Sequence, residues 1–236
     1  MTSSRLPGKV LLPLAEKPAL ERLIERLARS VYIDQIVVAT TTNADDDPII
    51  ALAERLNVGY FRGSEFDVLG RVLGAAKEYG ADIICEVTGD CPALDHRLID
   101  RGVEEFFSHD VDYCGNVNPL SLPIGFDSQV FPTSILDDVS RLTQDPIDRV
   151  HVSYYIYRHP ERFRLFNWSV DGELFWPELR ITLDEQGDYE LLQEIFTRLL
   201  PVKEDFSAID VIRLLREHPE LVELNKHIRQ KEAYEG

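Results

Sequence analysis

The chain has 236 residues, 44% of them hydrophobic, and a formal net charge of −17 at pH 7. This length suits a single large α/β domain, and the apolar content is enough to bury a sizeable core. The charge argues against a nucleic-acid-binding protein and against one that binds anionic membranes, because both need a basic face. No apolar run reaches the ~18 residues of a transmembrane helix and no charged leader pattern is present, so we expect a cytoplasmic protein without a membrane partner.

Strand and helix patterns alternate along the first half of the chain. Helical spacing of apolar residues predicts helices over 20–28, 49–56, 68–76 and 98–106, and short apolar runs predict strands over 36–39, 58–61 and 82–87. We expect Asp47 to cap the second helix, Gly80 to end the third, and the strand over 36–39 to be buried on both faces. This alternation predicts a Rossmann-like α/β fold, whose mostly parallel sheet has helices on both faces.

The alternation loosens after residue 111. The remaining patterns predict a strand over 126–131 in a smaller mixed layer, helices over 132–158, and strands over 163–170 and 180–183. Helices should fill the rest, one of them capped by Ser207 with Asp210 three positions on. Cys85, Cys91 and Cys114 are an odd, widely spaced set, which indicates reduced and mostly buried thiols. No repeat or linker is visible, so one domain over 1–236 is expected.

Two aspartates stand directly after predicted strands, where open parallel sheets bind their ligands. Asp90 follows the strand over 82–87, with Gly89 allowing a sharp turn, and Asp184 follows the strand over Arg180–Leu183. A carboxylate held rigidly at such an edge suits Mg²⁺, which takes one or two protein carboxylates together with substrate phosphates. Each aspartate alone could instead cap the next helix or turn, whereas the pair favours a metal site.

The first residues form a basic, turn-forming stretch, Ser3-Ser4-Arg5-Leu6-Pro7-Gly8-Lys9. Arg5 and Lys9 are fixed positive charges, the two serines supply hydroxyl donors, and Pro7-Gly8 forces a turn that exposes backbone N–H groups. Such a set can wrap a triphosphate. It is not a Walker A loop, because it has one glycine instead of two and Val10 in place of Ser or Thr. A basic surface turn would have the same pattern, so this alternative stays open.

A series of short motifs runs along nearly the whole chain. They are SSRLPGKVLLPL over 3–14, KPALERLIERL over 17–27, IVVAT over 36–40, FRGS over 61–64, TGDCP over 88–92, Pro123-x-Gly125-x-Asp127-x-x-Val130-Phe131, HVSYYIYRHPERF over 151–163, Leu183-Asp184 and ELNKHIR over 223–229. In this order they resemble the sugar nucleotidylyltransferases, specifically the acylneuraminate and 3-deoxy-manno-octulosonate cytidylyltransferase group. The likeness is closest to the spore coat polysaccharide biosynthesis protein F branch.

The resemblance implies a fold of the nucleotide-diphospho-sugar transferase type. It implies a nucleotide-binding half over 1–115, a sugar-binding and dimerisation half over 116–200, and C-terminal helices over 201–236. It also assigns roles to residues: Arg5, Lys9 and Asp90 are catalytic, Asp90 and Asp184 bind Mg²⁺, Ser3, Ser4, Arg62, Gly63 and Gly89 bind the nucleotide, and Gly125, Asp127, Arg149 and His151 shape the sugar site.

The implied reaction joins CTP and a sugar, with a sugar acid favoured, into a CMP-sugar and pyrophosphate for surface polysaccharide biosynthesis. Mg²⁺ is the implied cofactor, and a homodimer is left open. Arg149, Arg158 and Arg162 could meet a sugar carboxylate or be solvated charges on a helix face. His151 and His159 could act as a base, although a lone histidine in a helical stretch is more often structural.

Two other functions stay open. A nucleotide-sugar glycosyltransferase would use a similar sheet, but would normally show two aspartates separated by one residue, where this chain has Gly89-Asp90-Cys91. An inactive relative that binds a ligand or a partner is the second alternative. Retention of Arg5, Lys9, Asp90 and Asp184 argues against it.

The chain departs from the family pattern at two places. Glu185-Gln186 replace the usual Thr-Pro after the second metal aspartate, which could add acid to the metal site or only change a helix start. In relatives, a full apolar strand ending in an arginine precedes the position of Met1. Because that strand would lie in the middle of the sheet, we expect the natural chain to start roughly 7–12 residues upstream.

Overall fold

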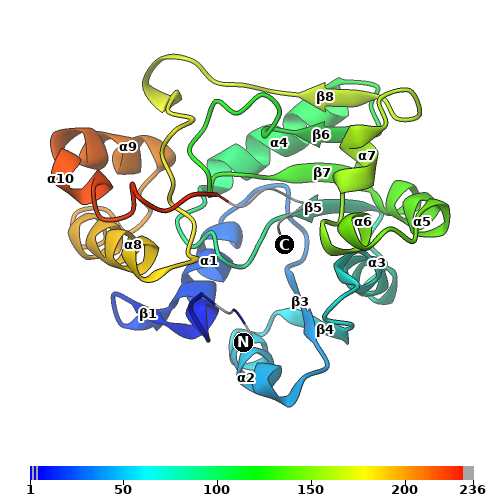
Figure 1. Cartoon of the computed structure of the whole chain (residues 1–236), viewed down its shortest axis with the longest axis horizontal. Coiled ribbons are helices and arrows are strands. Elements are labelled where there is room, and N and C mark those ends of the chain that lie inside the picture. The colour runs from blue at the N-terminus through cyan, green and yellow to red at the C-terminus, as the bar shows by residue number, and fades with distance from the viewer. Residues whose placement is uncertain (2, 4, 231–236) are drawn as a thin grey trace.

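The strands of the described residues fall into three hydrogen-bonded groups. The computed structural model describes residues 1, 3 and 5–230. Its strands are β1 (Pro13–Leu14), β2 (Lys17–Pro18), β3 (Val37–Thr41), β4 (Gly59–Gly63), β5 (Ile83–Glu86), β6 (Tyr113–Gly115), β7 (Gln129–Pro132) and β8 (Leu165–Asn167). β1 pairs antiparallel with β2, and β3 pairs parallel with β4. The third group has the order β5-β7-β6-β8 (Figure 1), in which β7 is antiparallel to both neighbours and β6 is parallel to β8.

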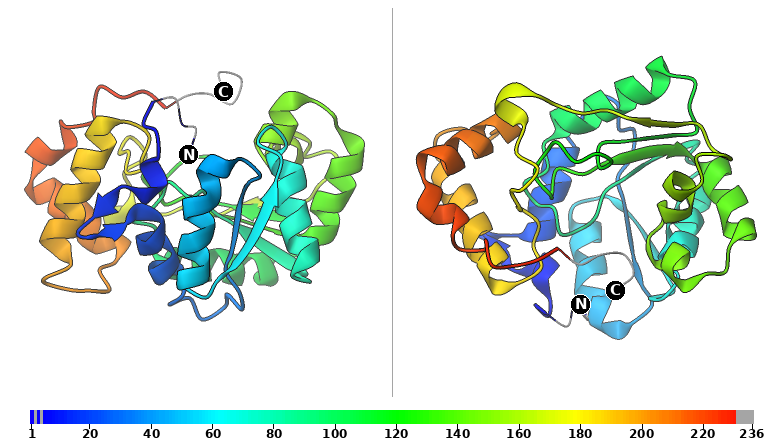
Figure 2. Two further views of the ribbon diagram at one scale, coloured as in Figure 1. Left: turned by 90° about the horizontal axis from the view of Figure 1, so that it is seen from below. Right: turned by 45° about the horizontal axis from the view of Figure 1, so that its top comes forward.

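Helices cover both faces of the four-stranded group. The α-helices are α1 (Ala19–Leu27), α2 (Asp47–Arg55), α3 (Val68–Glu78), α4 (His96–Ser108), α5 (Thr133–Leu142), α6 (Pro146–Val150), α7 (Tyr154–Arg158), α8 (Gln186–Leu199), α9 (Ala208–Glu217) and α10 (Pro219–Val222), and the 3-10 helices are η1 (Lys9–Leu11), η2 (Ala44–Asp46) and η3 (Gly172–Leu174). Val130 of β7 packs with α1, α4, α8 and α9, whereas the next residue, Phe131, packs on the other face with α3, α5 and α7. Figures 1 and 2 show α8–α10 at one end of the molecule and α3 with α5–α7 at the other. The expected Rossmann-like α/β architecture is confirmed.

Local sequence signals set the ends of several helices. α1 buries the apolar face that its helical spacing predicts. Gly80 has φ = 65°, in the left-handed region that glycine adopts readily, just beyond the end of α3. Ser207 and Asp210 form a capping box at the start of α9, as predicted.

The start of α2 differs from the prediction. Asp47 is the first residue of the helix, so Asp46 occupies the position that precedes it. The Asp46 carboxylate accepts hydrogen bonds from Thr40 Oγ1 and Thr41 N, at 2.7 and 3.0 Å, and none from the helix N–H groups. Asp46 therefore ties the end of β3 to the start of α2.

The segment over 132–158 is helical, as predicted, but it forms three short helices. Asp145 accepts a hydrogen bond from Ile147 N at 2.9 Å, and Pro146 occupies the first position of α6, where no backbone N–H is needed. The strand predicted over 163–170 is shorter, as β8. β6 was not predicted, because three residues are too few to show a period.

The prediction of a strand over Arg180–Leu183 is wrong. Among the described residues, one isolated bridge between Ile124 and Arg180 is its only strand-like pairing. Ile181 N donates to Ile124 O at 2.8 Å, while Leu183 N donates to Asp90 O at 2.8 Å. The N–H groups of this segment therefore reach two different parts of the chain, and no continuous ladder forms.

β3 is less buried than its apolar sequence predicts. Of its five residues, only Thr40 is fully buried, so the expectation of a strand covered on both faces is wrong. Within the described chain, β3 is hydrogen bonded to β4 alone and β5 to β7 alone. Each of these two strands thus has one edge without a strand partner among the described residues.

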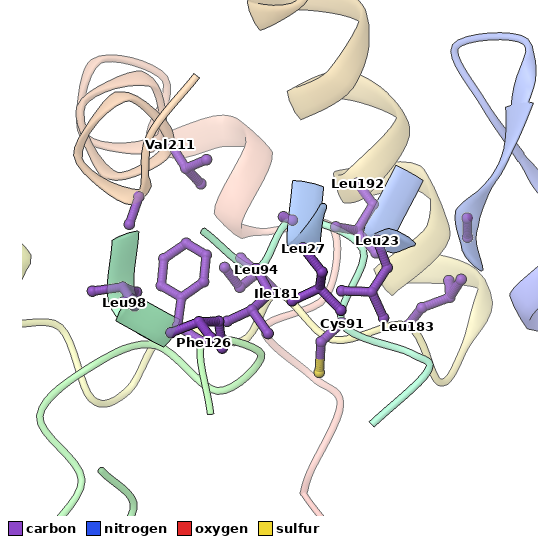
Figure 3. Packing of buried hydrophobic residues seen from close by; sticks show 14 of the residues in the cluster. Leu23, Leu27, Cys91, Leu94, Leu98, Phe126, Ile181, Leu183, Leu192 and Val211 are labelled. Atoms are coloured by element: carbon purple, nitrogen blue, oxygen red, sulfur yellow. The ribbon is translucent and has the colours of Figure 1, made fainter. Parts of the chain in front are cut away.

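The larger of two hydrophobic clusters supports the segments that carry the predicted metal ligands. Cys91 and Leu94, which follow Asp90, pack in it with Ile181 and Leu183, which precede Asp184 (Figure 3). All three cysteines are free thiols, Cys91 and Cys114 buried and Cys85 half-buried, as predicted. Across the described residues, no helix combines the length and apolar character needed to cross a membrane.

Candidate active site

Lys9 lies between the two aspartates that the sequence places at strand ends. Its Nζ atom is 2.6 Å from Asp90 Oδ2 and 2.7 Å from Asp184 Oδ1. Both carboxylates therefore converge on one point, although they belong to segments more than ninety residues apart in the sequence. The side chains of Lys9 and Asp184 are 16% and 11% exposed, so they are largely shielded from water without being closed to a ligand.

Arg5 joins this cluster from the same loop. Its Nη2 atom is 3.1 Å from Asp184 Oδ1, and its Nη1 donates to Glu185 Oε1 at 3.2 Å. Glu185 also precedes α8 and forms a capping box with Asp188. The replacement of Thr-Pro by Glu185-Gln186 thus sets the helix start, and it adds a carboxylate that pairs with Arg5.

Burial and neighbouring charges shift the pKa values of Lys9 and Asp184 in opposite directions. Burial by itself would raise the pKa of the Asp184 carboxyl, but the Lys9 ammonium and the Arg180 guanidinium outweigh it and lower that pKa. Burial would likewise lower the pKa of Lys9, yet Asp90 and Asp184 raise it. At neutral pH Asp184 is therefore ionised and Lys9 is protonated.

A buried network behind Asp184 fixes its orientation. Arg180 pairs with Asp184 Oδ2 and donates from Nε to Asp188 Oδ1 at 3.1 Å. Asp188 is fully buried and also accepts from Asp184 N at 3.0 Å and from Asn225 Nδ2 at 2.9 Å. The sequence analysis missed Arg180, Asp188 and Asn225, although the acidic pair at positions 184 and 188 was a visible signal.

The donor set fits a divalent cation that is shared with phosphates. Within the described chain, no group of three or more His, Cys, Asp or Glu residues could enclose a metal. Two converging carboxylates, Asp90 and Asp184, nevertheless match Mg²⁺, which takes one or two protein carboxylates and completes its shell with water and substrate oxygens. These residues would hold such an ion only together with a substrate that supplies further oxygens.

The predicted nucleotide-binding residues divide into two places. Ser3 accepts from Leu6 N at 3.4 Å within the opening loop, and Ser4 lies outside the described residues. Arg62 lies on β4, where Nε donates to Thr41 O at 2.9 Å and Nη2 to Asn43 O at 2.7 Å. Arg62 therefore organises the loop after β3, and its contact with a nucleoside stays a prediction.

The two predicted nucleotide-site glycines have different reasons to be small. A Cβ at Gly63 would come 2.9 Å from Arg71 Cγ, so close packing requires the glycine. A Cβ at Gly89 would meet only Leu20 and Val10 at ordinary contact distances, and its φ lies outside the left-handed range. The chain does turn at Gly89, as predicted, since Cys91 N donates to Thr88 O at 3.3 Å. The backbone there does not require glycine, so close approach of a ligand remains a reason for its size.

The four predicted sugar residues have different surroundings. Gly125 has φ = 108°, and a Cβ there would come 2.9 Å from the Ile181 backbone. Asp127 Oδ2 accepts a 3.4 Å hydrogen bond from Gly125 N. Arg149 pairs with Asp67 and donates to Ser140 O at 3.3 Å, so its guanidinium already has partners.

His151 lies between α6 and α7, with its ring 6.1 Å from that of Tyr154. His159 Nδ1 is 2.8 Å from Tyr155 O, and the rings of His159 and Tyr155 stack at 3.9 Å. These contacts give His159 a structural role. A role as base stays a prediction for His151.

Known proteins are similar to this chain in sequence and in fold. Residues 1–234 match the model of the cytidylyltransferase family. An uncharacterised protein of Methanocaldococcus jannaschii is 36% identical over 97% of this chain and 92% of its own length. Spore coat polysaccharide biosynthesis protein SpsF of Bacillus subtilis is 31% identical over 93% of this chain and 92% of its own.

A solved structure extends the likeness to three dimensions. A cytidylyltransferase from Leptospira borgpetersenii superposes with a TM-score of 0.89 at 31% identity, covering 98% of this chain and 95% of that one. The matches span the opening loop, both strand-end aspartates and the C-terminal helices. This chain belongs to the cytidylyltransferase family.

Proposed function

We propose that the protein transfers a cytidylyl group from CTP to a sugar hydroxyl, giving a CMP-sugar and pyrophosphate. One observation carries the proposal: the Lys9 ammonium lies within 2.7 Å of two carboxylates at the end of the sheet, with Arg5 beside them. A triphosphate and its cation need this combination of fixed positive charges and paired carboxylates. Membership of the family supports CTP as the nucleotide.

In the proposed reaction, a sugar hydroxyl oxygen forms a bond to the α-phosphorus of CTP. The bond from that phosphorus to the oxygen bridging to the β-phosphorus breaks, pyrophosphate leaves with the electron pair, and the hydroxyl proton goes to solvent. Arg5 and Lys9 would neutralise the charge that develops on the phosphate oxygens. Mg²⁺, held by Asp90 and Asp184, would supply further charge neutralisation at the phosphates.

The wider setting is also proposed. The likeness to a spore coat polysaccharide biosynthesis protein supports a role in making surface polysaccharide. A cytoplasmic location and a homodimer remain proposals that fit such an enzyme. A sugar acid, the acceptor that the sequence resemblance favours, would need a cation for its carboxylate. Arg149 would have to leave Asp67 to provide one.

A pyrophosphate-release assay tests the proposal. The full chain with Mg²⁺ is incubated with each of the four nucleoside triphosphates and a panel of neutral sugars, amino sugars and sugar acids. We expect release that depends on CTP and on one class of sugar. Sugar transfer from a nucleotide sugar without pyrophosphate release would favour a glycosyltransferase, and failure to bind CTP in calorimetry would favour an inactive relative.

A further inference from the structure

One row of paired residues crosses all four strands of the β5-β7-β6-β8 group. Glu86 pairs with Gln129, Gln129 with Gly115, and Gly115 with Asn167. Residues directly opposite each other on neighbouring strands project from the same face. The side chains of Glu86, Gln129 and Asn167 therefore share one face. We call these three residues and Gly115 the polar row.

The same face is apolar one step further into the sheet. The residues two positions away on each strand are Ile84, Phe131, Tyr113 and Leu165, which pack against α3 and α5. Side chains on one face of a strand recur every second residue. On this face, therefore, the residues next to the polar row along each strand already belong to the hydrophobic core. The polar row lies at the end of β5 from which the chain continues to Asp90.

Three acceptor atoms in this region lack a hydrogen-bond donor. Glu86 Oε2, Asn167 Oδ1 and Asp127 Oδ1 are buried and have no hydrogen-bond partner among the described residues. Gln129, in contrast, accepts from Tyr113 OH at 2.9 Å. Buried acceptors are nearly always paired, so three orphans distributed along one end of the four-stranded group indicate donors that a ligand would bring.

No positively charged side chain of the described residues pairs with these acceptors. Burial raises the pKa of the Glu86 carboxyl to about 7. Burial, with the Asp90 carboxylate adding to it, raises the pKa of Asp127 to about 6. Lys9 is paired with the two metal-site aspartates and Arg149 with Asp67. A ligand carboxylate placed here would meet other carboxylates.

We propose that the polar row binds the acceptor sugar and selects a neutral or amino sugar over a sugar acid. Because Glu86 and Asn167 lie on the two outer strands of the row, separate hydroxyl or ammonium groups of the sugar would donate to them, which satisfies the orphan acceptors. The inference rests on the proposed function and supplies its substrate class. Asp127, between the polar row and Asp90, is placed to receive a further donor nearer the reacting hydroxyl.

The first test measures pyrophosphate release from CTP and Mg²⁺ by the full chain with three sets of sugars. The neutral set is glucose and mannose, the amino set is glucosamine and mannosamine, and the acid set is 3-deoxy-manno-octulosonate and N-acetylneuraminate. We expect turnover with a neutral or amino sugar, and a kcat/KM at least about 10-fold lower with both acids, since like charges repel at an acceptor-lined face.

The second test replaces Glu86 without changing its shape. Glu86→Gln should raise KM for the accepted neutral or amino sugar by about 10-fold or more, because an amide oxygen is a weaker hydrogen-bond acceptor than a carboxylate, while the Kd for CTP stays unchanged. Asp82→Asn is the matched control: it removes one exposed carboxylate just before β5 and should change neither value. A melting curve for each variant establishes that it is folded.

The outcomes separate the two proposals. Turnover of the acids alone, an unchanged KM in Glu86→Gln, or CTP binding without turnover of any neutral or amino sugar overturns the assignment of the polar row. The first two of these leave the proposed function standing. Absence of both CTP binding and pyrophosphate release overturns the proposed function, and the substrate class with it.

Discussion

Lys9 contributes to the site through charge and position together. Two carboxylates that converge within hydrogen-bonding distance of one atom repel each other, and the Lys9 ammonium offsets that repulsion. Because all three side chains are partly shielded from water, this pairing is stronger than an exposed ion pair. One ammonium against two carboxylates leaves one negative charge, which Arg5 beside Asp184 offsets before any nucleotide arrives.

Asp90→Asn tests the metal role of the aspartate in the loop after β5. The variant should fold normally, because the Asp90 side chain is partly exposed, and should lose turnover by about 10²-fold or more if it removes a Mg²⁺ ligand. The measurement is the initial rate of pyrophosphate release at saturating and at limiting Mg²⁺. Asp82→Asn again serves as a control for loss of one carboxylate, and near-normal activity of Asp90→Asn at limiting Mg²⁺ would contradict the assignment.

Glu86 should make stability depend on pH. The carboxyl has an ordinary pKa of 4.5 when unfolded and about 7 when folded, so between these values the folded state holds the proton more tightly. The free energy of unfolding therefore falls as pH rises through this window and is constant above it. Urea titrations of wild type and Glu86→Gln at about pH 5 and about pH 8 should show that the wild type loses about 1–3 kcal/mol more than the variant over this window. Equal pH dependence in the two proteins would show that Glu86 is not desolvated.

At the scale of elements, the segment before α8 connects three parts of the chain. Leu183 N in this segment donates a hydrogen bond to Asp90 O. Gly125 has no side chain, which allows this segment to approach the residues before β7. Arg180 and Asp188 then join it to Asn225. The position of Asp184 thus depends on the C-terminal segment as well as on its own neighbours.

Asn225→Ala tests this connection. Asn225 is buried and donates to Arg180 O and to Asp188 Oδ1, both at 2.9 Å. Its removal leaves two buried acceptors short of a donor, which should lower the free energy of unfolding by about 2 kcal/mol in urea titration. Lys226→Ala, the neighbouring exposed position, should change it by less than about 0.5 kcal/mol. A loss of similar size in both variants would mean that the segment as a whole, and not this amide, matters.

At the scale of the molecule, β3 and β5 each have one edge without a strand partner among the described residues, and this bears on the expected first strand, which stays a prediction. Hydrogen-bonding groups on an unpaired strand edge must find water or another strand. A strand that paired with both edges would join the two groups into one sheet and would run directly into the Arg5–Lys9 loop.

The corresponding experiment compares the 236-residue chain with a version that carries about 7–12 additional residues before Met1, read from the upstream frame or designed as an apolar strand ending in arginine. The extended version should have a higher free energy of unfolding and a lower Kd for CTP, because the loop gains a rigid support. Equal stability and equal CTP affinity of the two versions would contradict the prediction.

Local patterns in the sequence determined the helices, most strands, the caps of α9 and the end of α3, because these depend on residues a few positions apart. They also singled out Arg5, Lys9, Asp90 and Asp184 by charge and place. Only the tertiary structure decided that Lys9 meets carboxylates 81 and 175 positions away, that Arg62 and Arg149 are engaged elsewhere, and that Arg180–Leu183 is not a strand. The polar row likewise depends on strand register, since neither the pairing of Glu86 with Gln129 nor their shared face can be read from the order of residues alone.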